Sequence, residues 1–245
     1  MSDMNCPESE PVLPALYLFP VGLSDTPAAD VLPQRNLQLL RRVRYFAVEN
    51  LRSARRFLKS VDRSIDIGSI TFFELDEHTR AADIPAMLEP LENGNPMGVL
   101  SEAGCPAIAD PGADLVAAAQ RRGLPVVPLV GPSSILLSLM GSGFNGQSFT
   151  FRGYLPVESG ARSRVLKEMQ RSIDRDRCTQ IFIETPYRNN RLISELARVL
   201  PGSMSLCVAS DVTGSDERII TRPLSWGAKA KYDYAKRPTI FLLYN

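Results

Sequence analysis

The sequence predicts an α/β protein of two domains, the first built on a mainly parallel sheet and the second on a mixed sheet. Short apolar runs alternate with amphipathic stretches, which is typical of strand–helix–strand units. After Gly146 the expected strands outnumber the expected helices. The length of 245 residues fits two domains of about 100–150 residues, and a hydrophobic share of 44% with 22% charged residues is enough for a sizeable core.

The first half of the chain contains five apolar runs that we expect to form strands, at 15–19, 45–48, 70–73, 97–100 and 126–130. Because these runs are almost continuously apolar, helices should cover both faces of their sheet. The intervening stretches predict helices at 36–43, 51–61, 84–93, 113–122 and 133–141. Leu115, Ala118 and Ala119 give the fourth of these helices a buried stripe.

The second half of the chain has a different texture. We expect strands at 149–155, 180–183, 204–209, 218–221 and 239–244, with helices at 162–173 and 189–200. The change of texture places a flexible N-terminal tail at 1–14, an N-terminal domain at 15–146 and a C-terminal domain at 147–245.

The composition excludes several classes of site. A single histidine, His78, excludes a multi-histidine metal centre, and it lies in a polar run typical of a surface loop. The four cysteines are too widely spaced for a Cys-x-x-Cys pair, so we expect reduced thiols, no metal and a cytoplasmic location. The chain shows neither a secretory leader nor an apolar run of about 18 residues, so no membrane association is expected.

Three expected strands end in loops rich in glycine, proline and small polar residues: 19–24, 101–112 and 130–134. In open α/β sheets, ligands collect at the carboxyl ends of strands. Each loop alone fits a sharp strand-to-helix turn, but three at one sheet favour a pocket. The sequence has no Gly-x-Gly-x-x-Gly and no Gly-x-x-x-x-Gly-Lys-Ser/Thr, which argues against a dinucleotide site and a P-loop.

Acidic candidates follow some of these strands. Glu49 either faces the pocket or complements the dipole of the next helix. Asp110 precedes Pro111 and Gly112 and fits a helix cap or a turn. Glu184 ends a strand of the second domain. Cys105 has no positive charge near it in sequence to lower its pKa, so a cysteine nucleophile is a minor alternative.

The loops together resemble a known family. The run Ser101-Glu-Ala-Gly-Cys-Pro-Ala-Ile-Ala-Asp-Pro-Gly112 resembles the Ser-Asp-Ala-Gly-Thr-Pro-x-Ile-x-Asp-Pro-Gly segment of the tetrapyrrole-methylase-like (class III) S-adenosylmethionine-dependent methyltransferases. Within them it is most similar to the branch that 2′-O-methylates a cytidine of small-subunit ribosomal RNA. Gly131-Pro-Ser133, Phe151-Arg-Gly-Tyr-Leu-Pro156 and Glu184-Thr-Pro-Tyr-Arg188 are similar to further motifs of that branch.

The resemblance implies two α/β domains with S-adenosylmethionine in a cleft between them, and a homodimer. By position within matched motifs, the cofactor-binding residues of the first-domain side would be Pro20, Ser101, Ala103, Gly104, Cys105, Ile108, Ser133 and Ser134. Glu184 and Ala209 would lie on the other side. A ribose hydroxyl is a poor nucleophile and should need a general base or a charge stabiliser. The candidate catalytic residues are Glu49, as the base, and Arg52, as a phosphate or substrate clamp.

Several substrate-side motifs depart from the branch. Its Glu-Asp-Thr-Arg is Glu49-Asn-Leu-Arg52 here, and its Arg-Glu-Leu-Thr-Lys is Ser210-Asp-Val-Thr-Gly214. The cofactor-side loops are better kept, so the methyl donor is supported more strongly than the acceptor. The leading hypothesis is a ribosomal RNA methyltransferase. The alternatives are a methyltransferase for a small, tetrapyrrole-like molecule, and a catalytically degenerate cofactor-binding protein.

The formal net charge of +1 conceals a divided chain. Residues 35–63 hold nine basic residues against Glu49 and Asp62, whereas residues 64–120 hold ten acidic residues against Arg80. Such blocks can place a basic face beside an acidic one, and arginine suits phosphate recognition. A solvated helix with scattered charges explains the basic block equally well, so the charge neither excludes nor establishes an RNA partner.

Overall fold

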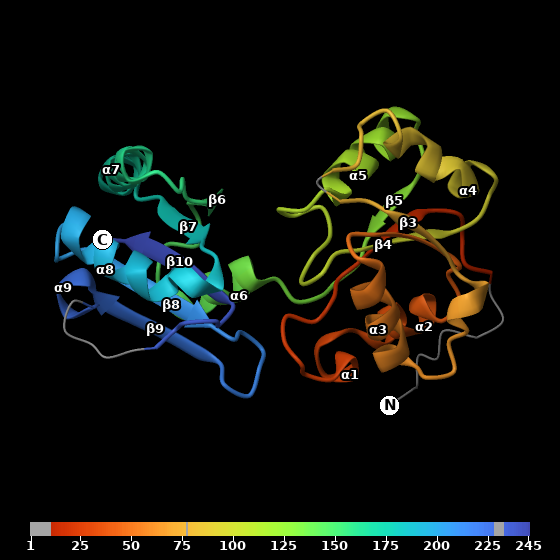
Figure 1. Cartoon of the computed structure of the whole chain (residues 1–245), viewed down its shortest axis with the longest axis horizontal. Coiled ribbons are helices and arrows are strands. Elements are labelled where there is room, and N and C mark those ends of the chain that lie inside the picture. The colour runs from red at the N-terminus through yellow and green to blue at the C-terminus, as the bar shows by residue number, and fades with distance from the viewer. Residues whose placement is uncertain (1–10, 77, 228–232) are drawn as a thin grey trace. The chain divides into compact units, whose positions relative to one another are not determined.

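The computed structural model describes residues 11–76, 78–227 and 233–245, and the chain divides into two compact units, Met1–Pro132 and Ser133–Asn245. We call them unit 1 and unit 2. Each unit contains one five-stranded sheet with its own hydrophobic core (Figure 1). The predicted fold class of two α/β domains is confirmed.

Unit 1 is a parallel sheet in the order β3-β2-β4-β1-β5. Its strands are β1 (Leu16–Phe19), β2 (Tyr45–Val48), β3 (Thr71–Glu74), β4 (Met97–Leu100) and β5 (Val126–Pro128). Its helices are α1 (Ala28–Val31), α2 (Gln34–Leu40), α3 (Leu51–Val61), α4 (Glu89–Glu92) and α5 (Gly112–Arg121), with 3₁₀ turns η1 (Ile67–Ser69) and η2 (Ile84–Leu88).

Helices cover both faces of this sheet, as its apolar strands predict. Leu40 of α2 and Leu58 of α3 pack on Phe46 at one face. Leu88 of η2 and Leu115 of α5 belong to the core cluster of the other face. Helices α4 and α5 lie on that side of the sheet (Figure 1). The helix expected at 84–93 is interrupted instead, as η2 followed by the short α4, because Pro85 and Pro90 lack the N–H that a continuous helix needs.

Unit 2 is a mixed sheet in the order β6-β7-β10-β8-β9, in which β6 and β7 are parallel and the other pairs antiparallel. Its strands are β6 (Phe149–Tyr154), β7 (Thr179–Ile183), β8 (Ser205–Ser210), β9 (Arg218–Pro223) and β10 (Thr239–Tyr244). Its helices are α6 (Ser134–Ser142), α7 (Ser159–Asp176), α8 (Asn189–Val199) and α9 (Leu224–Gly227), with the 3₁₀ turn η3 (Pro186–Arg188).

The division between the two compact units lies at Pro132/Ser133, whereas the texture of the sequence places the domain boundary at 146/147. The reason is α6, which packs on β8, β9 and β10. The Thr221 hydroxyl donates to the Ser142 carbonyl oxygen at 2.8 Å. Because α6 is apolar and follows a parallel strand, its sequence looks like a continuation of the first sheet.

The structure also bears on two expectations about the chain as a whole. Residues 1–10 of the expected N-terminal tail lie outside the described residues, while Val12 packs against the core of unit 1. No helix in the described part of the chain combines the length and hydropathy needed to span a bilayer.

Candidate functional site

The sheet of unit 1 has a switch point between β2 and β4. The connection after β2 leads to β3 at one edge of the sheet, and the connection after β4 leads towards β5 at the other edge. The loops that follow these two neighbouring strands therefore diverge, which is where open α/β sheets bind ligands. A small pocket there is lined by Glu49, Ser101 and Asp110, together with the apolar ends of β2 and β4.

The three glycine- and proline-rich loops meet at this carboxyl edge. Val21 and Gly104 exchange two backbone hydrogen bonds, at 2.8 and 3.1 Å, and so link the loops after β1 and β4. A Cβ on Gly131 would lie 2.3 Å from Cβ of Pro20, so only glycine lets the third loop approach the first. The Cys105 thiol donates to the Pro132 carbonyl oxygen at 3.4 Å.

The loop after β4 is held in an unusual backbone conformation. Gly104, Ala107 and Ala109 all have positive φ, at 73°, 65° and 62°. A non-glycine residue in this region costs about 1–3 kcal/mol, and such strain is concentrated at functional sites. The backbone of this loop therefore has a conformation that Ala107 and Ala109 would not adopt by their own φ preferences.

Asp110 holds this shape from within the loop. Its Oδ1 accepts hydrogen bonds from the Ala107 and Gly112 amides, at 2.9 and 2.7 Å. Its Oδ2 is buried and has no hydrogen-bond partner among the described residues, and burial raises the pKa of the carboxyl group. The sequence predicted a cap or turn residue, which agrees with the Gly112 contact, whereas the unpartnered oxygen is visible only in the fold.

The candidate catalytic residues lie at the same edge, on either side of the start of α3. Oε2 of Glu49 accepts from the Glu102 amide at 3.2 Å, and the Ser53 hydroxyl donates to the Glu102 carboxylate at 3.1 Å. Arg52 is an exposed residue in the first turn of α3. Asn50 starts this helix, because its side chain accepts from the Arg52 and Ser53 amides.

The remaining residues expected at this edge differ in their exposure to solvent. Pro20 is buried against Gly131, whereas Ile108 is 55% exposed. The Ser101 hydroxyl donates to the Ala103 carbonyl oxygen at 3.3 Å. Burial raises the pKa of the Cys105 thiol, so this side chain stays protonated and suits packing better than nucleophilic attack.

The other four candidate residues lie in unit 2. The Ser133 hydroxyl accepts from the Leu136 amide at 3.4 Å and caps α6, and Ser134 is the first residue of that helix. Ala209 lies within β8 between β10 and β9 and is fully buried, so its exposed surface offers a ligand no contact.

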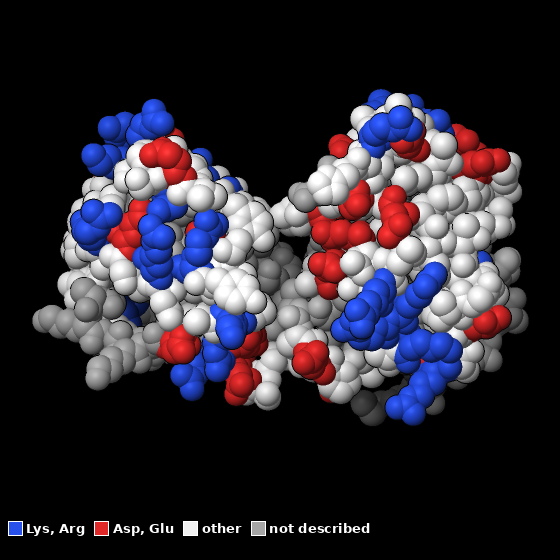
Figure 2. All heavy atoms as spheres, in the orientation of Figure 1, with Lys and Arg blue, Asp and Glu red and all other residues white. Residues whose placement is uncertain are grey.

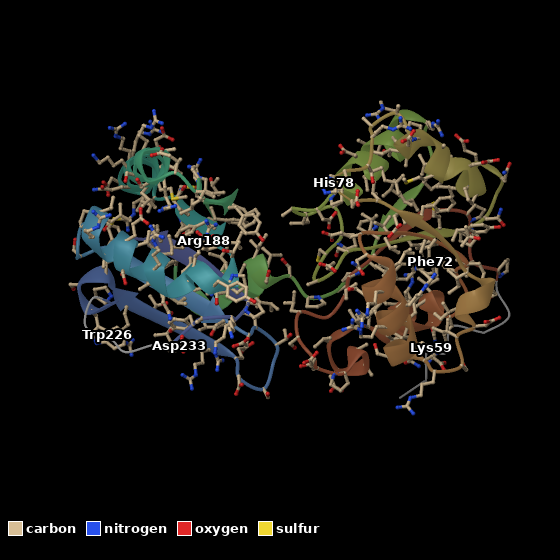
Figure 3. The ribbon with its side chains drawn as sticks, in the orientation of Figure 1. Lys59, Phe72, His78, Arg188, Trp226 and Asp233 are labelled. Carbon is tan, nitrogen blue, oxygen red and sulfur yellow. The ribbon has the colours of Figure 1, made fainter. Side chains whose placement is uncertain are left out.

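Glu184 is the centre of a local ion pair at the end of β7. Its Oε1 accepts from the Arg188 guanidinium at 2.6 Å and from the Thr185 amide at 2.7 Å. Arg188 is labelled in Figure 3. The carboxylate is buried, while the guanidinium is about one third exposed, at 32%. The motif Glu184-Thr-Pro-Tyr-Arg188 therefore closes on itself as a turn.

A second, buried ion pair was not expected from the sequence. Arg162 is the first residue of the helix expected at 162–173, and it is buried, with its guanidinium 2.7 Å from the Glu195 carboxylate of α8. It also donates to the Pro156 and Val157 carbonyl oxygens. Arg162, Glu195, Glu184 and Arg188 line one small polar pocket.

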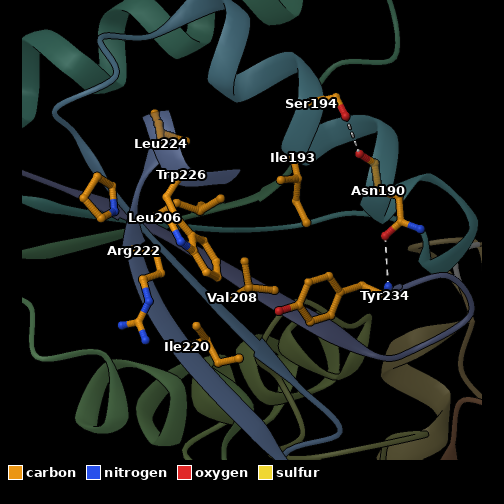
Figure 4. A pocket seen from close by; sticks show the side chains of 11 residues that line it. Asn190, Ile193, Ser194, Leu206, Val208, Ile220, Arg222, Leu224, Trp226 and Tyr234 are labelled. Carbon is orange, nitrogen blue, oxygen red and sulfur yellow. Dashed lines mark hydrogen bonds between the residues drawn. The ribbon is translucent and has the colours of Figure 1, made fainter. Parts of the chain in front are cut away.

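Unit 2 contains a further pocket between α8 and strands β8 and β9 (Figure 4). Its floor is apolar, and Arg222 lies over the ring of Trp226, 5.4 Å from the ring centroid. Asn190 accepts from the Tyr234 amide at 2.9 Å. Its lining residues come from several separate elements, so no single sequence motif could have indicated it.

Among the described residues, no group of three or more histidine, cysteine or acidic side chains is arranged to hold a metal ion. Cys105, Cys178 and Cys207 are free thiols. His78 is exposed, and its amide donates to Asp76 at 2.9 Å.

Comparison with known proteins decides the family. No family model matches the chain. Over 212 residues the chain is 32% identical to the Ribosomal RNA small subunit methyltransferase I of Vibrio cholerae, which covers 86% of this chain and 69% of that protein. The chain belongs to the Ribosomal RNA small subunit methyltransferase I family. The superfamily and branch indicated by its motifs are thereby confirmed, and it is a methyltransferase by family.

Other members of the family are longer than this chain. The Ribosomal RNA small subunit methyltransferase I of Micromonospora olivasterospora is 32% identical over 205 residues, which make up 84% of this chain and 61% of that protein. In the relative from Mycobacterium bovis the matched part is 59% of the protein. The chain thus spans about three fifths to two thirds of these relatives.

Solved structures share the fold. The Uroporphyrin III C-methyl transferase of Thermus thermophilus has a TM-score of 0.58 at 19% identity, covering 94% of this chain and 97% of that one. The methyltransferase CobJ has a TM-score of 0.61 at 16% identity, covering 94% of each chain. At these identities the likeness establishes the methylase fold and nothing finer.

Proposed function

We propose that this chain is an S-adenosylmethionine-dependent methyltransferase that modifies a ribose 2′-hydroxyl of small-subunit ribosomal RNA. The observation that carries the proposal is the meeting of the loops after β1, β4 and β5 at the carboxyl edge of the unit 1 sheet, next to the switch point between β2 and β4. This arrangement occurs in a chain whose family is named for ribosomal RNA methylation.

The residues at this edge fit the cofactor. Positive φ at Gly104, Ala107 and Ala109 turns the backbone of the β4 loop, and the glycine at 131 lets a second loop approach closely. Ile108 and Val130 are 55% and 76% exposed, and such apolar side chains suit the flat face of an adenosine. One related fold, the Thermus thermophilus enzyme, is known complexed with S-adenyl homocysteine.

In this proposal the cofactor is held by Pro20 and by the β4 loop residues Ser101, Ala103, Gly104, Cys105 and Ile108. Ser133, Ser134, Glu184 and Ala209 are carried over from the matched motifs as further candidate cofactor-binding residues. When bound, the sulfonium supplies the methyl group and carries its own leaving group, so the protein mainly has to orient the acceptor.

Glu49 is the proposed general base, because a ribose hydroxyl is a poor nucleophile until its proton is removed. The Glu102 amide orients the Glu49 carboxylate at the switch point. Arg52 follows three residues later, in the first turn of α3, and its proposed role is to hold a phosphate or the substrate.

The change Glu49→Gln tests this assignment. Turnover should fall by about 10²–10⁴-fold, because the amide cannot accept the proton. The dissociation constant of S-adenosylmethionine, measured by calorimetry, should stay the same. Glu89→Gln, on the exposed surface of α4, serves as the matched control and should leave both quantities unchanged. Unchanged turnover of the Glu49 variant would show that another group removes the proton.

The acceptor is tested with labelled S-adenosylmethionine and fractionated extract from a strain lacking this protein. Label in small-subunit ribosomal RNA supports the proposal. Label in the small-molecule fraction would instead support a tetrapyrrole-like acceptor, in line with the shared fold. Retention of the cofactor without any transfer would identify a catalytically degenerate protein.

We also propose that the protein is a homodimer in the cytoplasm, where its proposed acceptor is found. Support for self-association comes from the edge strand β6 of unit 2, around which Phe149, Tyr154 and Val157 are exposed apolar side chains. Sedimentation equilibrium tests the assembly, and a monomer at micromolar concentration would contradict it.

A further inference from the structure

One side of α3 is strongly basic. Arg52, Arg55, Arg56 and Lys59 are all exposed, and their spacing of three, four and seven residues places them on one side of the helix. We call these four residues the α3 basic face. In Figure 2, Lys and Arg side chains gather on the part of unit 1 that α3 occupies in Figure 1. The opposite side of the helix is apolar, because Ala54 and Leu58 are buried in the core.

Among the residues that the structure describes, pairing with acidic side chains does not explain these four charges. In the part of the chain that the structure describes, none of the four side chains forms an ion pair, that is, none has a side-chain nitrogen within 4.0 Å of a carboxylate oxygen. The neighbouring Arg41, by contrast, pairs with Asp62 at 2.7 Å. Lys59 donates a hydrogen bond to the Arg63 carbonyl oxygen, at 2.9 Å.

Helix stability does not explain these charges either. The first turn of α3 contains Arg52 and no acidic residue. A cation there is opposed by the positive end of the helix dipole, which favours acids in the first turn. Arg55 is instead held over the ring of Phe72 in β3, 5.6 Å from the ring centroid, so its guanidinium is oriented while remaining exposed. Phe72 and Lys59 are labelled in Figure 3.

The position of this face relates it to the candidate site. α3 begins two residues after Glu49, so Arg52 lies at the switch-point edge. From Arg52 to Lys59 the helix rises about 10 Å at 1.5 Å per residue. A row of cations thus starts beside the proposed general base and continues away from it.

We propose that the α3 basic face binds the phosphate groups of the acceptor RNA and sets the position of its backbone relative to Glu49. This inference rests on the proposed function. A row of arginines matches the regular charge and the bidentate oxygens of a phosphate backbone. Contacts of this kind fix the register of a nucleic acid without reading its sequence.

The test is the triple change Arg55→Gln, Arg56→Gln and Lys59→Gln, which leaves Arg52 in place. Binding of a small-subunit ribosomal RNA fragment is measured by fluorescence anisotropy at several salt concentrations. Each lost phosphate contact lowers the slope of log K against log salt by about 0.7–0.9, so the slope should fall by about 2–3. The KM for RNA should rise, while the affinity for S-adenosylmethionine stays unchanged.

A matched control comes from α7. Arg164, Lys167 and Arg171 are exposed at similar helical spacing, and changing them to Gln removes the same residue types and the same charge. This variant should keep the salt slope of the wild type. Equal loss in both variants would mean that net charge alone drives binding, and no loss in the α3 variant would mean that RNA binds elsewhere. Either result overturns the proposal.

Two further measurements separate the possible failures. Arg55→Lys with Arg56→Lys keeps the charge and should keep most of the salt slope, which a merely structural defect would not do. If the wild type methylates RNA and the α3 variant does so with an unchanged KM, this inference fails and the proposed function stands. If the wild type binds vesicles containing phosphatidylserine, but not RNA, both fail.

Discussion

Gly131 is the residue on which the packing of the three loops depends most directly. A methyl group at this position would lie 2.3 Å from Cβ and 2.6 Å from Cγ of Pro20, whose ring cannot turn away. Gly131→Ala should therefore destabilise the protein by about 1–3 kcal/mol, the usual cost of overpacking. It should also weaken the binding of S-adenosylmethionine.

Chemical denaturation and calorimetry measure these two effects. Gly146→Ala is the control, because a Cβ there meets no atom within 4 Å. Equal stability of the wild type and the Gly131 variant would show that the loops tolerate separation.

The buried ion pair of unit 2 gives a second prediction at the level of single residues. Glu195→Ala leaves the Arg162 guanidinium buried without its carboxylate, so we expect a loss of about 3–5 kcal/mol in the free energy of unfolding. The double variant with Arg162→Met and Glu195→Leu should regain most of this loss, because it removes both charges together. Urea denaturation of the three proteins tests this, and a double variant as unstable as the single one would contradict it.

At the level of elements, the end of α3 contains a titratable group with a direct effect on acid stability. The hydroxyl and the amide of Ser64, followed by the Arg41 guanidinium, lower the pKa of Asp62 from 3.8 to about 2. The folded protein thus binds this proton less tightly than the unfolded chain. The stabilising contribution is complete above about pH 4, and it is lost as the pH falls through about 2.

Asp62→Asn removes this pH-dependent contribution. The difference in melting temperature between the wild type and the variant should be largest near pH 5 and should shrink towards pH 2. Ser64→Ala removes the hydroxyl donor, so the pKa of Asp62 should rise. The loss of stability in acid should then begin at a higher pH than in the wild type. If the difference in melting temperature between the wild type and the Asp62 variant stays constant over this pH range, protonation of Asp62 is not linked to folding.

Most of the elements could be predicted because each is specified locally. The apolar run of β2, the Asn50 cap and the spacing of Ala54 and Leu58 specify Tyr45–Val48 and Leu51–Val61 directly. Arg162 shows where such reasoning fails. It shares a helical stripe with the buried Leu166, Met169 and Ile173, whereas a charged side chain is usually exposed.

The partner that resolves this conflict, Glu195, lies 33 residues away on another helix. The site shows the same division between local and long-range information. Its loops could be found by their glycines and prolines, and the Asp110 turn by its Asp-Pro-Gly sequence. The contact between Gly131 and Pro20, and the unpartnered Asp110 oxygen, depend on the order of strands in the sheet.

At the level of the whole molecule, the small net charge is the sum of large opposing blocks. Residues 35–63 carry nine basic residues, and the structure gives these charges different roles. Arg41 forms an ion pair, Arg44 donates to the Arg41 carbonyl oxygen, and Arg55 is held over an aromatic ring. Net charge is therefore a poor indicator of binding partners here. The clustering of exposed cations on one side of α3 is a better indicator.

The position of the boundary between the units leads to a last prediction about the whole chain. The core of unit 2 is formed by residues of that unit alone, and α6 covers the face of β8, β9 and β10 that α7 and α8 leave open. A fragment of residues 133–245 should therefore fold independently and unfold in one cooperative transition. A fragment of residues 147–245 lacks α6, so it exposes that apolar face.

The shorter fragment should be less stable and should bind a hydrophobic dye such as ANS. Circular dichroism melts and dye fluorescence of the two fragments compare them directly. Equal stability would favour the boundary at 146/147 that the sequence suggests. A higher melting temperature of the longer fragment would show that α6, although it directly follows a loop of the first sheet, belongs to the folding unit of the second.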